Sequence, residues 1–163
     1  MGGRAVLFAV EDADAKRLLA ADDDADVRAV VEELEERWER PWLGQLDKAW
    51  DALHRCLTDG TLTYAAGEYP LSHAILGGYL LHEGDEWEVG YVAPDEVRDV
   101  AEALAPLDEA WVRERYETLT FVDYDGIADE DDIGYTAGNL VDLKDFYRRA
   151  AAAGRAVILT VDP

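Results

Sequence analysis

Two short segments of this chain combine residue types that could carry out acid–base or nucleophilic chemistry. In the segment LDKAWDALHRCL at 46–57, Asp51 lies three residues before His54, and further along Ser72 directly precedes His73. A histidine beside a carboxylate can act as a general base, and one beside a serine can activate the hydroxyl as a nucleophile. The candidate catalytic residues are therefore His54, Asp51, Ser72 and His73, and the corresponding reaction class is a hydrolase acting on a small molecule.

The segment 46–57 also has the pattern of a helix that packs against a core. At about 100° per residue, its apolar side chains gather on one face. Lys48 falls almost opposite that face, so it is not expected to converge with His54. Asp51 and Arg55 are expected to form an exposed ion pair, with His54 at the border of the core. A histidine in this position is more often structural than catalytic. The predicted core face consists of Leu46, Ala49, Trp50, Leu53 and Leu57.

The pair Ser72 and His73 gives a weaker catalytic signal than its residue types suggest. Adjacent residues of a strand point to opposite faces of a sheet, so the two side chains are not expected to meet. No G-x-S-x-G elbow surrounds Ser72. The hydrolase therefore remains the alternative hypothesis.

The residue patterns give no support for a metal or cofactor site. The lone cysteine, Cys56, excludes a disulfide framework and is expected to be a small buried apolar residue. The acidic segment 122–134 fails the EF-hand pattern, because Phe121 would occupy the first ligand position. The sequence contains no Walker or G-x-G-x-x-G motif. A histidine zinc site would need the only three histidines to converge, namely His54, His73 and His82. We therefore expect neither a metal nor a cofactor.

Hydrophobic patterning predicts a single α+β domain over residues 1–163. The two apolar segments 5–10 and 156–161 are predicted to be strands that meet in one sheet. Two or three short strands are expected within 61–93, with a turn at 83–87. The fold class is thus a small mixed sheet that includes both terminal strands and is packed by about five to six helices. Those helices are expected over 11–21, 27–40, 46–57, 94–105, 109–119 and 140–153, with the aspartates at 22–24 capping the second.

The net charge of −22 excludes several classes of partner. Nucleic acids and anionic membranes bind through cationic residues, so neither is expected as a partner. A large negative net charge often keeps a protein soluble, including at high salt. It can also steer a protein toward a basic protein partner, as in acidic inhibitors of basic nucleases.

The composition indicates a protein that folds on its own in a reducing compartment. The apolar run 5–10 is too short for a signal-peptide core or a membrane span, and no cleavage site follows it. With a single cysteine, a cytoplasmic location is the simplest expectation. We expect a monomer or a weak homo-oligomer.

Several segments together resemble one known family over nearly the whole chain. They are LDKAWDALHRCLTDG, PLSHAILGG, GYVAPDEVRDVAEALAPLDEAWVRERY and LVDLKDFYRRAAAAGRAVILTVD. Their order and spacing resemble the YfbM-like family of bacterial proteins of unknown function. The resemblance implies a small cytoplasmic α+β domain, but it implies no reaction and no site residues. Ala93 stands where the family often has Ser or Thr, so the helix that follows is expected to lack a side-chain cap.

Two hypotheses from different classes follow. The leading one is a non-enzymatic binding module, of inhibitor or immunity type, that meets a basic protein through an acidic surface. It predicts an exposed apolar patch rimmed by acids. The alternative is the hydrolase, which requires His54 or His73 in a pocket, within reach of a carboxylate.

Overall fold

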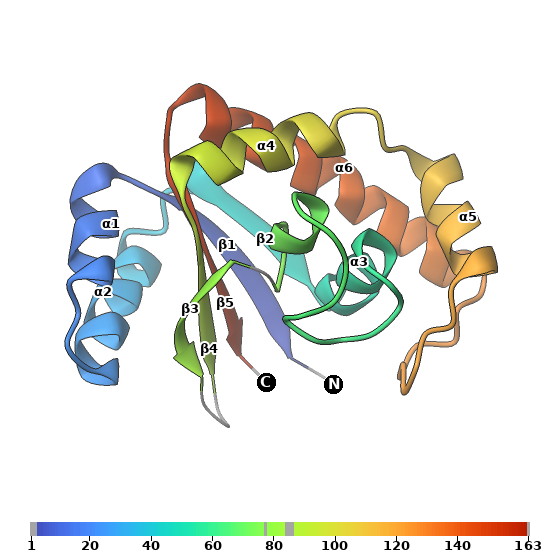
Figure 1. The fold of residues 1–163 in the computed structure, drawn as a ribbon, viewed down its shortest axis with the longest axis horizontal. Coiled ribbons are helices and arrows are strands. Elements are labelled where there is room, and N and C mark those ends of the chain that lie inside the picture. The colour runs from blue at the N-terminus through green and yellow to red at the C-terminus, as the bar shows by residue number, and fades with distance from the viewer. Residues whose placement is uncertain (1–2, 77, 84–86, 163) are drawn as a thin grey trace.

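The centre of the protein is a five-stranded sheet in the order β2-β1-β5-β4-β3 (Figure 1). We describe it from a computed structural model, which defines residues 3–76, 78–83 and 87–162. Among these residues every strand pairing is antiparallel, so the α+β class is confirmed, but the sheet is not mixed. The strands are β1 (Arg4–Val10), β2 (Leu43–Asp47), β3 (Tyr79–Glu83), β4 (Glu88–Val92) and β5 (Ala156–Asp162).

The two terminal strands pair at the middle of this sheet. β1 and β5 run antiparallel from the pair Arg4 and Asp162 to the pair Val10 and Ala156. Leu7 faces one core of the protein and Phe8 faces the other. Because both faces of the central strands are covered, both strands are almost continuously apolar. This confirms the prediction that the apolar segments at the chain ends meet in one sheet.

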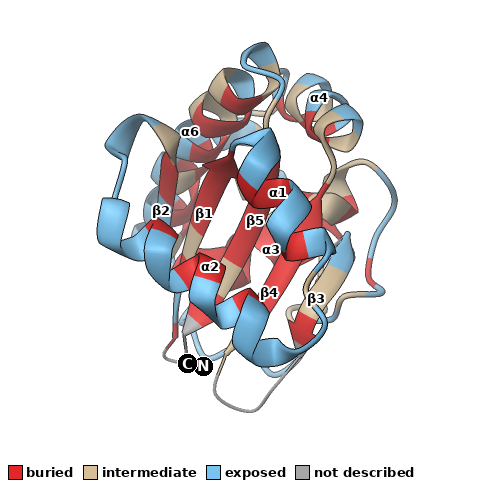
Figure 2. Cartoon of the chain, turned by 90° about the vertical axis from the view of Figure 1, so that its left-hand side faces the viewer, coloured by how far each residue is buried: buried red, intermediate tan, exposed pale blue. Residues whose placement is uncertain are grey.

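Helices cover both faces of the sheet (Figures 1 and 2). The helices α1 (Asp12–Leu19) and α2 (Asp24–Arg37) pack over one face, on a core that includes Phe8 and Ile158. The larger core on the other face contains residues of the remaining four helices. These are α3 (Trp50–Leu57), α4 (Pro94–Leu104), α5 (Glu109–Thr118) and α6 (Glu130–Ala152).

Aspartate side chains cap the N-termini of three of the helices. The Asp23 carboxylate accepts a hydrogen bond from the Asp26 N–H at 2.9 Å, so the acidic run before α2 does cap that helix. Asp108 and Asp129 cap α5 and α6 in the same way. At α4, Ala93 provides no side-chain cap, as expected, and the Glu96 carboxylate instead accepts from the Ala93 N–H at 3.0 Å.

Two helix predictions were wrong at their N-terminal ends. The segment 46–57 is divided, because Leu46 and Asp47 belong to β2 and α3 begins only at Trp50. Asp47 has φ of 47°, a left-handed conformation that ends the strand, and pairing with β1 overrides the local helical pattern. The last helix begins at Glu130, not near Leu140. Two glycines inside it, at 134 and 138, are poor helix formers and concealed its first ten residues.

The segment 61–93 contains two strands, in agreement with the prediction of two or three. Two strands, β3 and β4, pair antiparallel, and a single 3₁₀ turn, η2 (Leu71–His73), precedes them. A second 3₁₀ turn, η1 (Arg40–Trp42), leads into β2. The predicted turn at 83–87 falls on residues 84–86, which lie outside the described residues.

Candidate functional site

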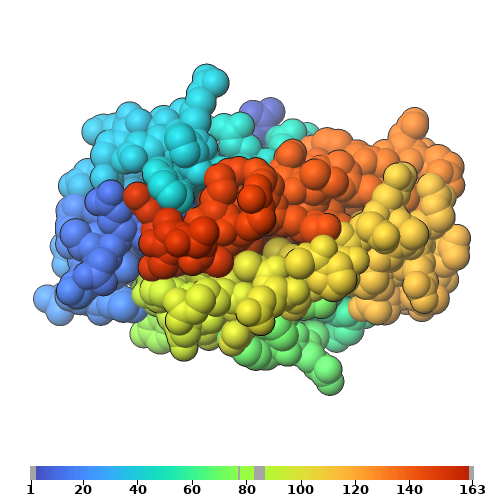
Figure 3. Space-filling model, turned by 90° about the horizontal axis from the view of Figure 1, so that it is seen from above, coloured from blue at the N-terminus to red at the C-terminus, as the bar shows by residue number. Residues whose placement is uncertain are grey.

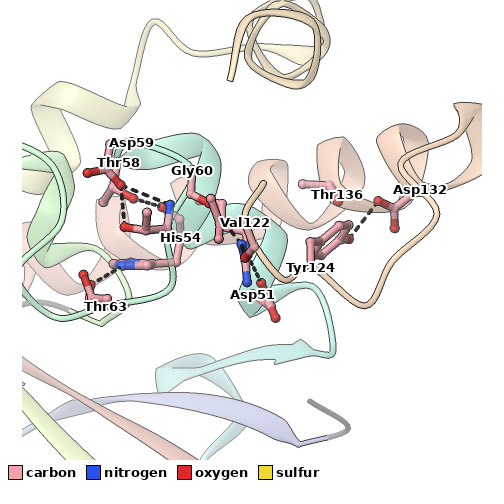
Figure 4. A network of polar contacts seen from close by, with 12 residues as sticks. Asp51, His54, Thr58, Asp59, Gly60, Thr63, Val122, Tyr124, Asp132 and Thr136 are labelled. Atoms are coloured by element: carbon pink, nitrogen blue, oxygen red, sulfur yellow. Dashed lines mark hydrogen bonds and ion pairs between the residues drawn. The ribbon is translucent and has the colours of Figure 1, made fainter. Parts of the chain in front are cut away.

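His54 is buried and lies within reach of two backbone groups. Its ring is fully buried on α3, with Nε2 2.8 Å from the Thr63 carbonyl oxygen (Figure 4). Nδ1 lies 3.5 Å from the Leu76 amide nitrogen. Burial lowers the pKa of His54, which favours a neutral ring that donates from Nε2 to Thr63. The predicted position at the border of the core is wrong, because the chain around Thr63 and Leu76 covers this side of α3.

Asp51 and Arg55 form a buried ion pair, where an exposed one was predicted. Arg55 Nε lies 2.5 Å from Asp51 Oδ1, and the two side chains are only 3% and 9% exposed, respectively. Arg55 Nη1 also donates to the Gly60 carbonyl at 3.0 Å and to the Val122 carbonyl at 2.5 Å. Asp51 is therefore held by Arg55 and does not orient His54. Nothing near Arg55 in the sequence predicts this contact with Val122.

The Arg55 contact holds a segment that we call the acidic loop, residues 119–129, between α5 and α6. A second arginine, Arg115 on α5, donates to the carbonyls of Cys56 and Thr58 at 2.8 and 2.5 Å, and so ties α5 to the end of α3. Gly60 has φ of +93°, and a Cβ there would lie 2.4 Å from the Thr120 carbonyl oxygen. Only glycine permits this close approach between the end of α3 and the acidic loop.

Tyrosine hydroxyls fix the other end of the acidic loop to α6. Tyr124 donates to Asp132 Oδ2 at 2.8 Å (Figure 4), and Tyr116 on α5 donates to the same oxygen at 2.9 Å. The Tyr116 oxygen also lies 2.9 Å from Thr136 Oγ1. Phe121 packs between the two tyrosine rings. Burial raises the pKa of both Tyr116 and Tyr124, so both hydroxyls stay protonated and act as donors.

The outer side of the acidic loop presents apolar side chains to solvent. Ile127 is 85% exposed and Val122 is 52% exposed. Asp123, Asp129 and Asp131, which lie close to them in the sequence, are also exposed. The acidic loop is thus anchored through Val122 and Tyr124 and presents exposed aliphatic and acidic side chains.

Ser72 and His73 do meet, contrary to the prediction from strand geometry. They lie in the turn η2, where Ser72 Oγ is 3.1 Å from His73 Nδ1. His73 Nε2 lies 3.3 Å from Glu96 Oε2 on α4. No local pattern connects Glu96 with this pair, since Glu96 lies 23 residues beyond His73 and its position suits a helix start. Tyr69 packs edge-on against His73, and its hydroxyl donates to Asp99 at 2.5 Å, which raises the pKa of Tyr69 to about 12.

The candidate residues therefore separate into two places. His54 and Asp51 belong to the interior of α3, whereas Ser72 and His73 lie beside the start of α4. The third histidine, His82 on β3, has its own surroundings, with Asp24 Oδ1 2.8 Å from Nδ1 and the Trp87 ring stacked at 3.8 Å. Within the described ranges, no three His, Cys, Asp or Glu side chains gather in a way that could hold a metal ion.

Two open cavities lie away from all these candidates. One is a groove of about 680 Å³ between α4 and α6, which lie side by side in Figure 3, and its lining includes apolar residues such as Ala101 and Val141. The other, of about 420 Å³, lies at the free edge of β2. Neither lining contains His54, Asp51, Ser72 or His73.

The fold and these polar networks define a small α+β protein in which two of the four candidate catalytic residues, His54 and Asp51, are buried and hydrogen-bonded or ion-paired within the interior. The chain belongs to the DUF1877 family, described as a domain of unknown function, whose profile matches residues 1–160. It is YfbM-like, as the sequence segments suggested. The crystal structure of YfbM from Escherichia coli, a protein of unknown function, matches with a TM-score of 0.70 and 20% identity over 97% of this chain and 99% of that one.

The comparisons establish the family and the fold, and they assign no activity. A search of curated proteins found no match. In the described part of the chain, none of the helices combines the length and the apolar character that a bilayer crossing requires.

Proposed function

We propose that this protein is a non-enzymatic binding module that contacts a basic protein partner through the acidic loop. The observation that carries the proposal is Ile127, which is 85% exposed on a loop whose inner side is anchored to two helices. An exposed aliphatic side chain surrounded by acids is the patch expected of an interaction surface.

The charge of the chain supports a basic partner. A net charge of −22 attracts a cationic protein over a distance and accelerates the encounter. After the encounter, Ile127 and Val122 can bury apolar area, while Asp123 and Asp131 remain at the rim. Rim charges contribute mainly to the association rate, so raised salt should slow association more than it speeds dissociation.

The anchoring of the acidic loop supports the same proposal. Arg55 holds the Val122 carbonyl, and Tyr124 holds Asp132 at the start of α6. A loop that is already ordered loses less conformational entropy on binding than a free one. Asp51, first considered as a partner of His54 in catalysis, pairs instead with Arg55, and this buried pair acts here to position an interaction surface.

A photo-crosslinking amino acid placed at position 127 tests the proposal, with Leu19 on α1 as the control position. Leu19 is also an exposed aliphatic residue, at 54%, but lies elsewhere on the chain. We expect a basic protein to be captured from position 127 and not from position 19. With that partner purified, Ile127→Asp should weaken the complex by at least about tenfold. Capture of the same proteins from both positions, or an unchanged affinity in Ile127→Asp, would contradict the proposal.

The array of Ser72, His73 and Glu96 keeps a hydrolase as a second candidate. Glu96 can accept the Nε2–H of His73, which leaves Nδ1 free to take the Ser72 proton. Ser72 is the only serine in the sequence, so a fluorophosphonate probe reports on it alone among serines. A hydrolase predicts labelling that is lost in His73→Ala as well as in Ser72→Ala. If the wild-type protein is not labelled, this candidate should be dropped.

A further inference from the structure

The outer edge of β2 faces an open cavity, which we call the edge cavity. β2 ends the sheet order and pairs only with β1 among the described strands. The cavity has a volume of about 420 Å³, within the range of sites that bind ligands. Its lining residues are Trp38, Arg40, Leu43, Gly44, Gln45, Asp142, Asp145 and Arg149.

The edge cavity extends to both faces of the sheet. Trp38 ends α2 on one face, where it packs edge-on against Phe8 and remains 37% exposed. Asp142 comes from α6 on the other face (Figure 2). α6 approaches β2 closely, since a Cβ on Gly44 would lie 3.1 Å from the Phe146 ring. The backbone of the edge strand is therefore flanked by an indole on one side and by a carboxylate on the other.

One carboxylate of the edge cavity is free to meet a ligand. Asp145 forms ion pairs with Arg148 and Arg149, and Arg149 also donates to the Pro41 carbonyl. Asp142 is exposed, and no ion pair or hydrogen bond to it is found in the part of the chain that the structure describes. The negative field of the whole chain adds to its attraction for a cation.

Only the end of β2 at Leu46 and Asp47, where the register with β1 shifts, carries an edge irregularity, and the part before it has no lysine or proline. Natural edge strands often carry lysine or proline, or are covered by another element. The strand β2 reads LGQLD, and its exposed central residue, Gln45, is neutral. The edge cavity leaves the space beside it open.

We propose that the edge cavity binds an extended peptide segment of a protein partner, which adds to the sheet as a strand beside β2. Alternate side chains of a strand point to opposite faces, so the segment should place a basic residue toward Asp142 and an apolar residue next to it, toward Trp38. Arg40 can donate to carbonyl oxygens of the segment. This site lies apart from the acidic loop and does not depend on the function proposed for that loop.

The probe for this proposal is a ten-residue peptide of alternating lysine and valine, compared with the same peptide carrying glutamate in place of lysine. We expect the lysine peptide to bind and the glutamate peptide not to bind. Asp142→Lys should weaken binding by about tenfold or more, since it places like charges together. Glu117→Lys, an exposed site on α5 with the same change in net charge, is the control and should change affinity by less than about twofold.

Methylated peptides separate strand pairing from general attraction between charges. In a paired strand, every second N–H points toward the neighbouring strand. One variant of the lysine peptide is N-methylated at every valine and the other at every lysine. One of these two variants should lose binding, because its methyl groups point toward β2, and the other should keep it. Equal effects of the two sets, or equal effects of Asp142→Lys and Glu117→Lys, would overturn the proposal. The variant Ile127→Asp should leave the affinity of the lysine peptide unchanged, so a failure at one surface is distinguishable from a failure at the other.

Discussion

Replacing Arg55 with methionine is the most demanding test of the buried network under the acidic loop. Methionine has a similar length and keeps the apolar packing, but it removes three contacts, those with Asp51, the Gly60 carbonyl and the Val122 carbonyl. The Asp51 carboxylate would remain 9% exposed without its cation. Arg55→Met is therefore expected to destabilise the protein severely.

The expected loss can be estimated from these contacts. Breaking a buried ion pair by removing one partner costs about 3–5 kcal/mol. The two carbonyl oxygens lose charge-assisted hydrogen bonds, at roughly 1 kcal/mol each when water replaces part of the interaction. The total of about 5–7 kcal/mol is a large part of the 5–15 kcal/mol by which domains of this kind are usually stable.

Urea unfolding measures this loss, and a double variant tests its cause. In Asp51→Leu with Arg55→Met, no unpaired charge remains, so this protein should be more stable than Arg55→Met alone by at least about 2 kcal/mol. Lys16→Met breaks the exposed pair with Asp12, also an i, i+4 pair, and should leave the midpoint unchanged within error. A loss below about 1 kcal/mol in Arg55→Met, or no recovery in the double variant, would refute the reasoning.

Three further predictions follow from the buried groups. Burial lowers the folded-state pKa of His54 below its unfolded value near 6.5, so the free energy of unfolding should be full above that pH and fall as the pH drops below it. His54→Gln can still donate to Thr63 but does not titrate, so it should flatten the profile of urea midpoint against pH between about pH 7 and 5. Burial raises the pKa of Cys56 to about 12, so the thiol should react with Ellman's reagent only as the protein unfolds in urea, and rapid reaction of the native protein would contradict its buried position. Gly60→Ala should destabilise by more than about 1 kcal/mol because of its positive φ and the Thr120 carbonyl. Gly134→Ala, where a Cβ meets nothing within 4 Å, should instead stabilise α6 by about 0.5–1 kcal/mol, and equal effects of the two changes would contradict the requirement for glycine beside the Thr120 carbonyl.

Much of the fold follows from local patterns in the sequence. The strands β1 and β5 are recognisable because burial on both faces demands continuous apolar residues. The helix α2 is recognisable from its apolar periodicity and the aspartates at its start. β2 was missed because its five residues, LGQLD, continue an apolar spacing that a helix can also use, and only its pairing with β1 decides the outcome.

The candidate site was less predictable because its important contacts are distant in sequence. Arg55 meets Val122 across 67 residues, so a helical wheel places Arg55 wrongly at the surface. The contact of His73 with Glu96 likewise joins two elements that have no shared local pattern. The Ser72 and His73 side chains are in contact because both residues lie in a 3₁₀ turn. The rule that adjacent side chains point to opposite faces applies only to strands. Residue types indicated where chemistry was possible, and long-range packing buried His54 and Asp51 while it brought Glu96 to His73.

Hydrogen–deuterium exchange of the protein, alone and in complex with the partner captured at position 127, tests the central proposal most directly. We predict that binding slows exchange over 121–132, at the acidic loop and the first turn of α6. The groove between α4 and α6 should be unaffected, since it lies outside the proposed contact. Slowed exchange at that groove, with the acidic loop unchanged, would contradict the proposal that the acidic loop is the docking surface.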